Sequence, residues 1–195
     1  MAERRAVMLH GTNGSPSELQ WQGWLERQLE AAGYKVYFPQ LPDCDAPNLK
    51  TYDQFLKDSG WNFSDNVLIG HSSGATTVLH LLMQDWFPHV RAVVLVGTFL
   101  NERLLNAALW YVPGQFDYLF VEEFDTEKIK LKADAFYFVH GDNDPYCDYN
   151  EAKELCDKLG GDFITMPGAG HLAKSANIAV LPELIERLRS DEILN

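Results

Sequence analysis

A serine flanked by small residues is the clearest candidate for chemistry in this sequence. The segment Gly70-His71-Ser72-Ser73-Gly74 matches the pattern G-x-S-x-G, in which the central hydroxyl is a nucleophile. The five letters alone are a weak signal, because a glycine- and serine-rich helix start without chemistry also produces them. Their position is more informative, since an apolar strand over 66–69 precedes them and an apolar helix over about 73–85 follows. This context predicts a nucleophile elbow that presents Ser72 above the end of the strand.

A serine hydroxyl is a poor nucleophile at neutral pH and needs a base within hydrogen-bond reach. After such an elbow, an Asp or Glu and then a His are expected, each on a loop that follows a strand. The sequence supplies both in that order, with His140-Gly141-Asp142-Asn143-Asp144 after one predicted strand and His171 on a glycine-rich loop after the next. His171 is therefore the predicted base, while Asp142 and Asp144 both qualify as the acid that orients it.

The other five histidines fit the role of the base less well. His71 precedes the serine in the turn, so its side chain should point away from the path of attack. His10 and His140 end predicted strands at the same edge of the sheet and could line the site, but they come in the wrong order. His80 within a helix and His89 beside a proline are expected to be structural or surface residues.

Two backbone N–H groups are expected to stabilise the negative charge that develops on a substrate oxygen. Ser73 supplies the first, because it follows the nucleophile at a helix N-terminus. The second should come from the loop after the first strand, His10-Gly11-Thr12-Asn13-Gly14, whose glycines let the backbone approach a substrate. We predict Thr12 as this donor, with Asn13 as the alternative.

The elements that must position these loops follow from hydrophobic patterning. Apolar segments of strand length alternate with segments of helical period, which predicts a mainly parallel six-stranded sheet with helices on both faces. The expected strands cover 5–10, 35–38, 66–69, 91–96, 135–139 and 162–166, and the expected helices cover 15–33, 49–59, 73–85, 148–159 and 182–189. Ser15 and Glu18 are predicted to form a capping box at the first helix. The fold class is a compact three-layer α/β/α sandwich, in a single domain over 1–195.

One connection departs from this alternation. Residues 98–124 lie between the fourth and fifth strands and contain Phe99, Trp110, Tyr111, Phe116, Tyr118, Phe120 and Phe124. Such an aromatic cluster is more often core than pocket. Because the segment begins at the edge where Ser72 is expected, we predict a short lid that also forms a wall for an acyl or aromatic group.

Composition excludes several classes of function. Of the 195 residues, 46% are hydrophobic and 23% charged, as in one ordinary globular domain. The net charge of −12 opposes nucleic-acid binding, which relies on clustered Lys and Arg. No apolar run approaches the ~18 residues needed to span a bilayer, and the N-terminal apolar stretch is too short for a signal peptide. We therefore expect a cytoplasmic protein without a nucleic-acid or membrane partner.

No pattern for a metal or a cofactor is recognised in the sequence. Cys44, Cys147 and Cys156 are an odd number without paired spacing, which argues against disulfides, and neither C-x-x-C nor H-E-x-x-H occurs. Gly11-x-x-Gly14 lacks the Lys-Ser/Thr of a phosphate loop, and G-x-G-x-x-G is missing. We expect no metal and no cofactor, and we interpret Cys147 as a packing residue near the acid loop.

These motifs together resemble the retinoblastoma-binding protein 9/YdeN-like serine hydrolases of the α/β-hydrolase superfamily. The resemblance spans nearly the whole chain and rests on His10-Gly11, Trp24, Leu41-Pro42, the segment around Ser72, Phe116-Asp117, the loop from His140 to Asp144, and the loop from Gly168 to His171. It implies an α/β-hydrolase fold with a minimal lid, and it places the acid three residues after the glycine of the His-Gly loop, on Asp144.

The sequence departs from this family in two respects. Cys147 stands where many relatives carry Val or Ile, a difference expected to alter packing only. An L-x-C-x-E motif is missing, so binding to retinoblastoma-type pocket proteins is not carried over from the resemblance.

The residues and the resemblance together predict a serine hydrolase that acts on a small-molecule, ester-like substrate through an acyl-enzyme. Ser72 would attack the carbonyl, His171 would move the proton and Asp144 would hold His171. Carboxylic esters are the expected substrates, with thioesters or small amides as variants of the same chemistry. The alternative is a catalytically silent α/β-hydrolase-fold module that binds a protein, because a fold does not fix a function.

Overall fold

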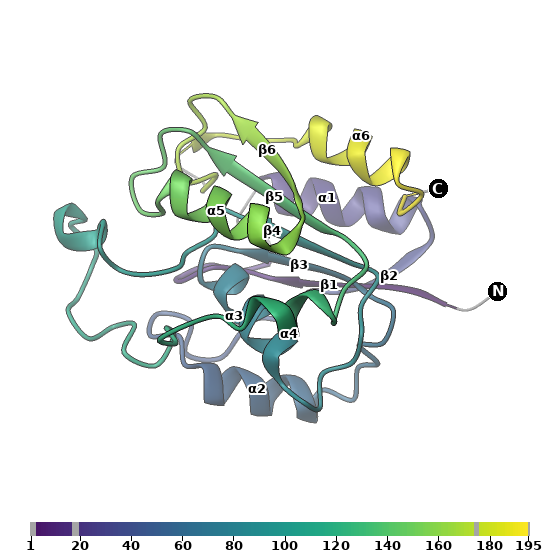
Figure 1. The fold of residues 1–195 in the computed structure, drawn as a ribbon, viewed down its shortest axis with the longest axis horizontal. Helices are drawn as coiled ribbons and strands as arrows, with labels where there is room; N and C mark the ends of the chain where they lie inside the picture. Colours follow the sequence, from purple (N-terminus) through teal and green to yellow (C-terminus); the bar gives the residue numbers. More distant parts are fainter. Residues whose placement is uncertain (1–2, 17–19, 174–175, 195) are drawn as a thin grey trace.

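The computed structural model describes residues 3–16, 20–173 and 176–194. Its centre is a six-stranded sheet with the strand order β2-β1-β3-β4-β5-β6 (Figure 1). The strands are β1 (Arg4–Leu9), β2 (Tyr34–Tyr37), β3 (Val67–His71), β4 (Ala92–Val96), β5 (Phe136–Gly141) and β6 (Asp162–Met166). All neighbouring pairs of these strands are parallel. Their carboxyl ends, and the loops that follow them, therefore meet at one edge of the sheet.

The central strands β3 and β4 are buried along their whole length. They pair in register from Val67 opposite Ala92 to His71 opposite Val96. β4 is a continuous apolar run and β3 is nearly so, as expected for parallel strands that are covered on both faces. The strand that leads into the predicted elbow is thus fixed in the middle of the sheet.

Helices cover both faces of the sheet and complete a three-layer α/β/α structure (Figure 1). α1 (Gln20–Ala31) and α6 (Pro182–Ser190) pack on one face, whereas α2 (Leu49–Asp58), α3 (Ser73–Met83), α4 (Thr126–Lys130) and α5 (Tyr149–Leu159) pack on the other. Successive strand residues alternate between the two layers, because side chains in a strand point to opposite faces. Ala6 and Met8 belong to the core under α1, and Val7 and Leu9 to the core under α3.

The structure differs from the expected elements in two places. α1 is described from Gln20 onward, Ser15 lies outside any helix, and Glu18 of the predicted capping box lies outside the described residues. α4 is a helix that the patterning does not predict. It has five residues, too few for a hydrophobic period to be recognised, and it begins where the Asp125 side chain accepts a hydrogen bond from the N–H of Lys128.

The connection over 98–124 leaves β4 at the carboxyl edge and extends outward from the sheet (Figure 1). Its only helical segment among the described residues is a 3₁₀ helix, Leu105–Ala107. Its buried side chains form a third, small core: Phe99, Leu105, Phe116 and Leu119, together with Leu49 and Cys147. Part of the aromatic cluster is therefore core, but Trp110 keeps 39% of its surface exposed. The exposed part of this segment lies at the edge where the predicted site residues gather.

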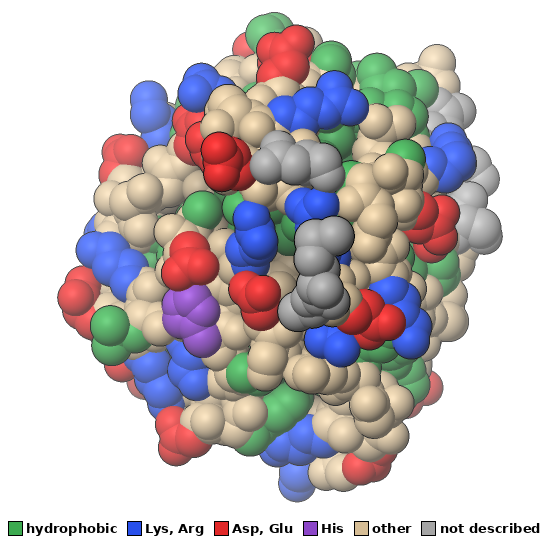
Figure 2. Space-filling view, turned by 90° about the vertical axis from the view of Figure 1, so that its right-hand side faces the viewer, with side chains coloured by type: hydrophobic (Ala, Val, Ile, Leu, Met, Phe, Trp, Pro, Cys, Tyr) green, Lys and Arg blue, Asp and Glu red, His purple; other side chains and the backbone are tan. Residues whose placement is uncertain are grey.

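The amino ends of the strands lie at the opposite edge of the sheet (Figure 1). Figure 2 shows this side, where acidic and basic side chains are mixed among polar and apolar ones. None of the helices in the described parts of the chain is long and apolar enough to cross a membrane.

Candidate active site

The turn after β3 brings Ser72 to the carboxyl edge with a strained backbone. Ser72 has φ 55° and ψ −123°, and its N–H donates to the carbonyl of Val96 at 2.9 Å. A Cβ at Gly70 would lie 2.5 Å from the carbonyl oxygen of Gly74, and a Cβ at Gly74 would overlap the carbonyl oxygen of Leu9. The strand, the turn and α3 can pack this closely only because both flanking residues are glycine. The local structure is that of the predicted elbow.

Three side chains from separate loops form a continuous hydrogen-bonded chain at this edge. Oγ of Ser72 lies 2.8 Å from Nε2 of His171, and Nδ1 of His171 lies 2.8 Å from Oδ2 of Asp144. An ionised carboxylate only accepts hydrogen bonds, so Nδ1 carries the ring proton and Nε2 accepts from the serine hydroxyl. The structure thus brings together the three residues that the sequence singles out, although they come from loops after β3, β5 and β6.

The carboxylate of Asp144 is buried but well supplied with donors. Its side chain is 0% exposed, and its Oδ1 accepts the N–H of Tyr146 at 2.9 Å and that of Cys147 at 3.0 Å. Burial raises the pKa of this carboxyl, but the hydrogen bond and charge of His171 and the two backbone N–H groups outweigh burial, and the pKa lies below its ordinary value. Asp144 is therefore ionised at neutral pH and faces His171 with its other oxygen.

The second candidate aspartate binds a different partner. Asp142 is exposed, and its Oδ1 accepts the N–H of Gly168 at 2.8 Å. Oδ1 of the neighbouring Asn143 accepts the N–H of Gly170 at 2.7 Å. Both side chains therefore fasten the acid loop to the loop that carries His171. The order of residues alone left the two aspartates as alternatives, the family resemblance selected Asp144, and Asp144 is the one that contacts His171.

Two further side chains, which no motif marks, hold the His171 loop from the side of the sheet. Nε2 of His71 donates to the carbonyl of His171 at 3.0 Å, and Nε1 of Trp21 donates to the carbonyl of Leu172 at 2.8 Å. Burial lowers the pKa of His71 to about 3, so its ring is neutral and places no positive charge beside His171. The partners lie about a hundred or more positions apart in the sequence, which is why local patterns do not reveal them.

His10 and His140 are fully buried and fix loop backbones. Nε2 of His10 accepts the N–H of Leu41 at 2.9 Å, and its Nδ1 donates to the carbonyl of Gly11 at 2.9 Å. Nδ1 of His140 donates to the carbonyl of Gly141 at 3.1 Å. These histidines shape the loops after β1 and β5.

The loop after β1 lies directly against the elbow. A Cβ at Gly11 would come within 2.8 Å of the Cβ of the elbow serine. Oγ1 of Thr12 donates to Oγ of Ser73 at 2.9 Å, which ties this loop to the first residue of α3. The N–H of Asn13 donates to the carbonyl of Cys44 at 3.0 Å. The N–H of Asn13, the alternative to that of Thr12 as oxyanion donor, is therefore already bound to a carbonyl outside the elbow.

Cys147 contacts the hydrogen-bonded chain in addition to filling the small core. It is 2% exposed, and its Sγ lies 3.6 Å from Nδ1 of His171 and 3.4 Å from the carbonyl oxygen of Gly97. On another side, the ring of Tyr146 packs edge-on against the His171 ring, with centroids 5.2 Å apart. Tyr146 and Cys147, which follow Asp144 by two and three positions, thus contact the imidazole from two sides.

A mostly apolar cavity of about 420 Å³ lies beside Tyr146. Its lining residues are Leu104, Ala108, Leu109, Trp110, Pro145 and Tyr146. The rings of Trp110 and Tyr146 pack edge-on with centroids 5.3 Å apart. Since Tyr146 also contacts His171, a single aromatic ring separates this cavity from the hydrogen-bonded chain.

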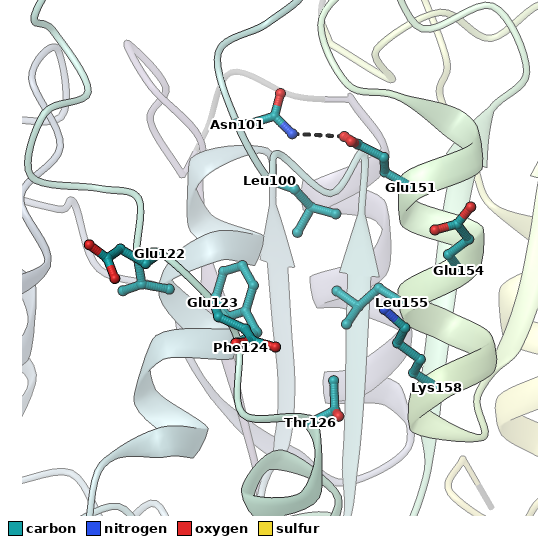
Figure 3. A pocket seen from close by; sticks show the side chains of 11 residues that line it. Leu100, Asn101, Glu122, Glu123, Phe124, Thr126, Glu151, Glu154, Leu155 and Lys158 are labelled. Carbon is teal, nitrogen blue, oxygen red and sulfur yellow. Dashed lines mark hydrogen bonds between the residues drawn. The ribbon is translucent and has the colours of Figure 1, made fainter.

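A larger cavity of about 520 Å³ lies between α5 and the end of the long connection (Figure 3). Leu100, Phe124 and Leu155 line it with apolar surface, and four glutamates surround them: Glu122, Glu123, Glu151 and Glu154. Figure 3 shows Asn101 donating to Glu151, at 2.7 Å. The lining residues include no Ser72, Asp144 or His171. We therefore assign the chemistry to the carboxyl edge rather than to this cavity.

Comparison with known proteins identifies the family of this chain. The family described as serine hydrolase matches residues 6–190. The chain belongs to this family. As a serine hydrolase it is a hydrolytic enzyme, and the predicted resemblance to retinoblastoma-binding protein 9 and YdeN is confirmed.

Individual relatives support the same conclusion. The hydrolase is 23% identical over 169 residues to serine hydrolase RBBP9 of Rattus norvegicus, with 86% of each chain covered. Its fold is similar to that of the ydeN gene product of B. subtilis, at a TM-score of 0.82 and 19% identity over 96% of this chain and 97% of the other. The esterase domain of a Rhodothermus marinus protein matches at a TM-score of 0.61 and 20% identity, over 96% and 87%. The α/β-hydrolase fold is thereby confirmed.

Proposed function

We propose that this serine hydrolase cleaves carboxylic esters through an acyl-enzyme formed on Ser72. The observation that carries the proposal is the relay of two 2.8 Å contacts from Ser72 through His171 to Asp144. In this relay the serine hydroxyl donates to a neutral imidazole, and the imidazole donates to a buried carboxylate. This arrangement activates a serine nucleophile.

The proposed reaction has two halves. Oγ of Ser72 attacks the ester carbonyl while Nε2 of His171 takes the hydroxyl proton, and the tetrahedral intermediate then expels the alcohol, which receives that proton. A water molecule next attacks the acyl carbonyl, again giving its proton to His171, and the carboxylic acid leaves as Ser72 regains its hydrogen. Asp144 stabilises the imidazolium that exists between these transfers.

The N–H groups of Ser73 and Thr12 are the proposed oxyanion donors. Ser73 is the first residue of α3, where helix N–H groups have no partner within the helix. Thr12 belongs to the loop that Gly11 allows to lie against Ser72. The hydrogen bond from Thr12 to Ser73 holds the two segments together, and the engagement of Asn13 with Cys44 favours Thr12 over Asn13.

The proposed substrates carry an apolar acyl or alcohol group. The cavity beside Tyr146 is apolar, and its volume suits a short alkyl chain or an aromatic ring. The net charge of −12 disfavours polyanionic substrates, because their approach would be opposed by the field of the whole protein. Thioesters and small amides undergo the same chemistry and are the closest variants of the proposal.

A fluorophosphonate probe, which reacts with activated serines, tests the proposal directly. We expect the wild type and the Ser64→Ala control, which changes an exposed serine, to be labelled. Ser72→Ala should not be labelled, and both Ser72→Ala and His171→Ala should lose p-nitrophenyl acetate turnover by at least about a thousandfold. A wild type that is neither labelled nor active on esters, thioesters or anilides would overturn the proposal in favour of a catalytically silent binding module.

A further inference from the structure

Asp144, Cys147 and His171 form a cluster of three different metal-ligating side chains. One oxygen of the carboxylate, Sγ of Cys147 and Nδ1 of His171 all lie within 4.8 Å of one another. No sequence motif for metal binding covers these residues, because the histidine lies on a different loop from the other two. The cluster exists only because the loops after β5 and β6 meet.

One distance within this cluster fits a tetrahedral zinc ion. Zn²⁺ bonds to imidazole nitrogen at about 2.0 Å and to thiolate at about 2.3 Å, so the two ligand atoms stand about 3.5 Å apart at a tetrahedral angle. Sγ of Cys147 lies 3.6 Å from Nδ1 of His171. The Nδ1 to carboxylate contact of 2.8 Å, which holds a proton, would have to widen by about 0.6 Å to hold the ion.

The surroundings of the ligands support a bound cation. Oδ1 of Asp144 is occupied by the N–H groups of Tyr146 and Cys147, which leaves Oδ2 directed at the cluster. These hydrogen bonds fix the carboxylate in the way that neighbours of metal ligands commonly do. Burial and the charge of Asp144 raise the pKa of the Cys147 thiol, so its thiolate forms only together with the ion. The carboxylate and that thiolate would then neutralise the two charges of the ion in this buried place.

We propose that Asp144, Cys147 and His171 form an inhibitory site for a thiophilic divalent cation such as Zn²⁺. The regulatory part of this inference rests on the proposed function of Ser72 and His171. An ion on Nδ1 leaves the neutral imidazole with its proton on Nε2, where it faces Ser72 as a donor. The imidazole can then no longer accept the serine proton, and the nucleophile is not activated.

The proton balance of binding gives a readout that does not depend on activity. Metal ligands must be deprotonated, so the ring proton moves from Nδ1 to Nε2 and the thiol of Cys147 releases its proton to solvent, while the carboxylate that accepts from Nδ1 has no proton to release. One proton is therefore released for each ion bound. Titration calorimetry in buffers of different ionisation enthalpy measures this number.

The first experiment measures inhibition of p-nitrophenyl acetate turnover by Zn²⁺ and its reversal by a chelator. The activity of the wild type should fall at least tenfold at saturating Zn²⁺. Cys147→Val, with Cys147→Ala as a second variant should Val fail to fold, should need at least about tenfold more Zn²⁺ for the same loss. Cys156→Ala, which changes a buried cysteine in another core cluster, is the matched control and should respond like wild type. Equal inhibition of wild type and both Cys147 variants, or no inhibition of wild type, would overturn the proposal.

The second experiment separates failure of this inference from failure of the proposed function. In Ser72→Ala, which lacks the nucleophile but keeps the three ligands, we expect one Zn²⁺ per chain and one proton released. Co²⁺ in the same variant should give the thiolate-to-cobalt absorption of a tetrahedral site, and this absorption should be lost with Cys147→Val added. No stoichiometric binding in Ser72→Ala would overturn the metal site, whereas an unlabelled, inactive wild type would overturn the proposed hydrolysis and, with it, the inhibitory role.

Discussion

At the scale of single residues, two carboxylates two positions apart have different neighbours. Asp144 Oδ2 contacts Nδ1 of His171 at 2.8 Å, whereas Asp142 accepts the N–H of Gly168 and remains exposed. A carboxylate that binds the imidazole fixes its tautomer and stabilises its protonated form. A carboxylate that binds only a loop backbone contributes at most to the order of that loop. The pair therefore offers a direct test of which aspartate serves the proposed reaction.

We predict that Asp144→Asn lowers kcat for p-nitrophenyl acetate by about 10⁴-fold, because the amide can force the wrong tautomer on the imidazole. Asp142→Asn should lower kcat by less than about tenfold, since an amide oxygen can still accept from Gly168. Stopped-flow or steady-state assays of both variants, with circular dichroism to confirm folding, make the comparison. Similar losses in the two variants would contradict the assignment.

At the scale of elements, we propose that the connection over 98–124 decides what reaches the carboxyl edge. Its buried residues anchor it through a small core of its own, and Trp110, which follows its 3₁₀ segment, packs against Tyr146. The anchored part and the exposed part have different roles: one holds the segment in place and the other offers apolar surface to a ligand. We therefore propose that chain-length preference is a property of this one short element.

We predict that Trp110→Ala lowers kcat/KM for p-nitrophenyl octanoate by about tenfold, because an apolar chain loses a burying partner worth roughly 1.4 kcal/mol. Turnover of p-nitrophenyl acetate, whose acyl group is too short to fill the cavity, should change by less than about twofold. Tyr118→Ala alters an aromatic residue of the same connection that is 71% exposed and outside the cavity lining, and it serves as the control. Equal losses on both esters would place the acyl group elsewhere.

At the scale of the whole molecule, buried neutral histidines make the stability of the fold depend on pH. Burial lowers the pKa of His71 to about 3 from an ordinary value of 6.5, and burial also lowers the pKa values of His140 and His80. Between pH 3 and 6.5 the unfolded chain therefore binds a proton at His71 that the folded chain does not. Stability must rise with pH across this window and fall as the pH drops through it.

We predict that the free energy of unfolding decreases from pH 7 to pH 4, with His71 contributing up to about 1.4 kcal/mol per pH unit below 6.5. Urea denaturation at several pH values measures this slope. His71→Asn removes the titrating group and should flatten the slope, even though it also weakens the hold on the His171 carbonyl. His89→Asn, which changes a half-exposed histidine, is the comparison variant. An unchanged slope in His71→Asn would contradict the prediction.

The sequence by itself determined the class of fold and the loops that carry the candidate site. Apolar segments spaced by helices dictate a parallel sheet, since buried strands must be apolar and parallel strands need crossovers. Gly70 and Gly74 mark the elbow because backbone contacts leave no room for a side chain there. The order of Ser72, an aspartate and His171 along the chain then follows from loops at one edge.

Only the tertiary structure decided which groups touch. The choice of Asp144 over Asp142 came from family resemblance in the sequence, but its hydrogen bond to His171 is a contact between loops 27 positions apart. The same holds for Cys147 beside the imidazole and for His71 beneath it. Side-chain contacts across loops depend on packing summed over the whole fold, and no local period or motif encodes them.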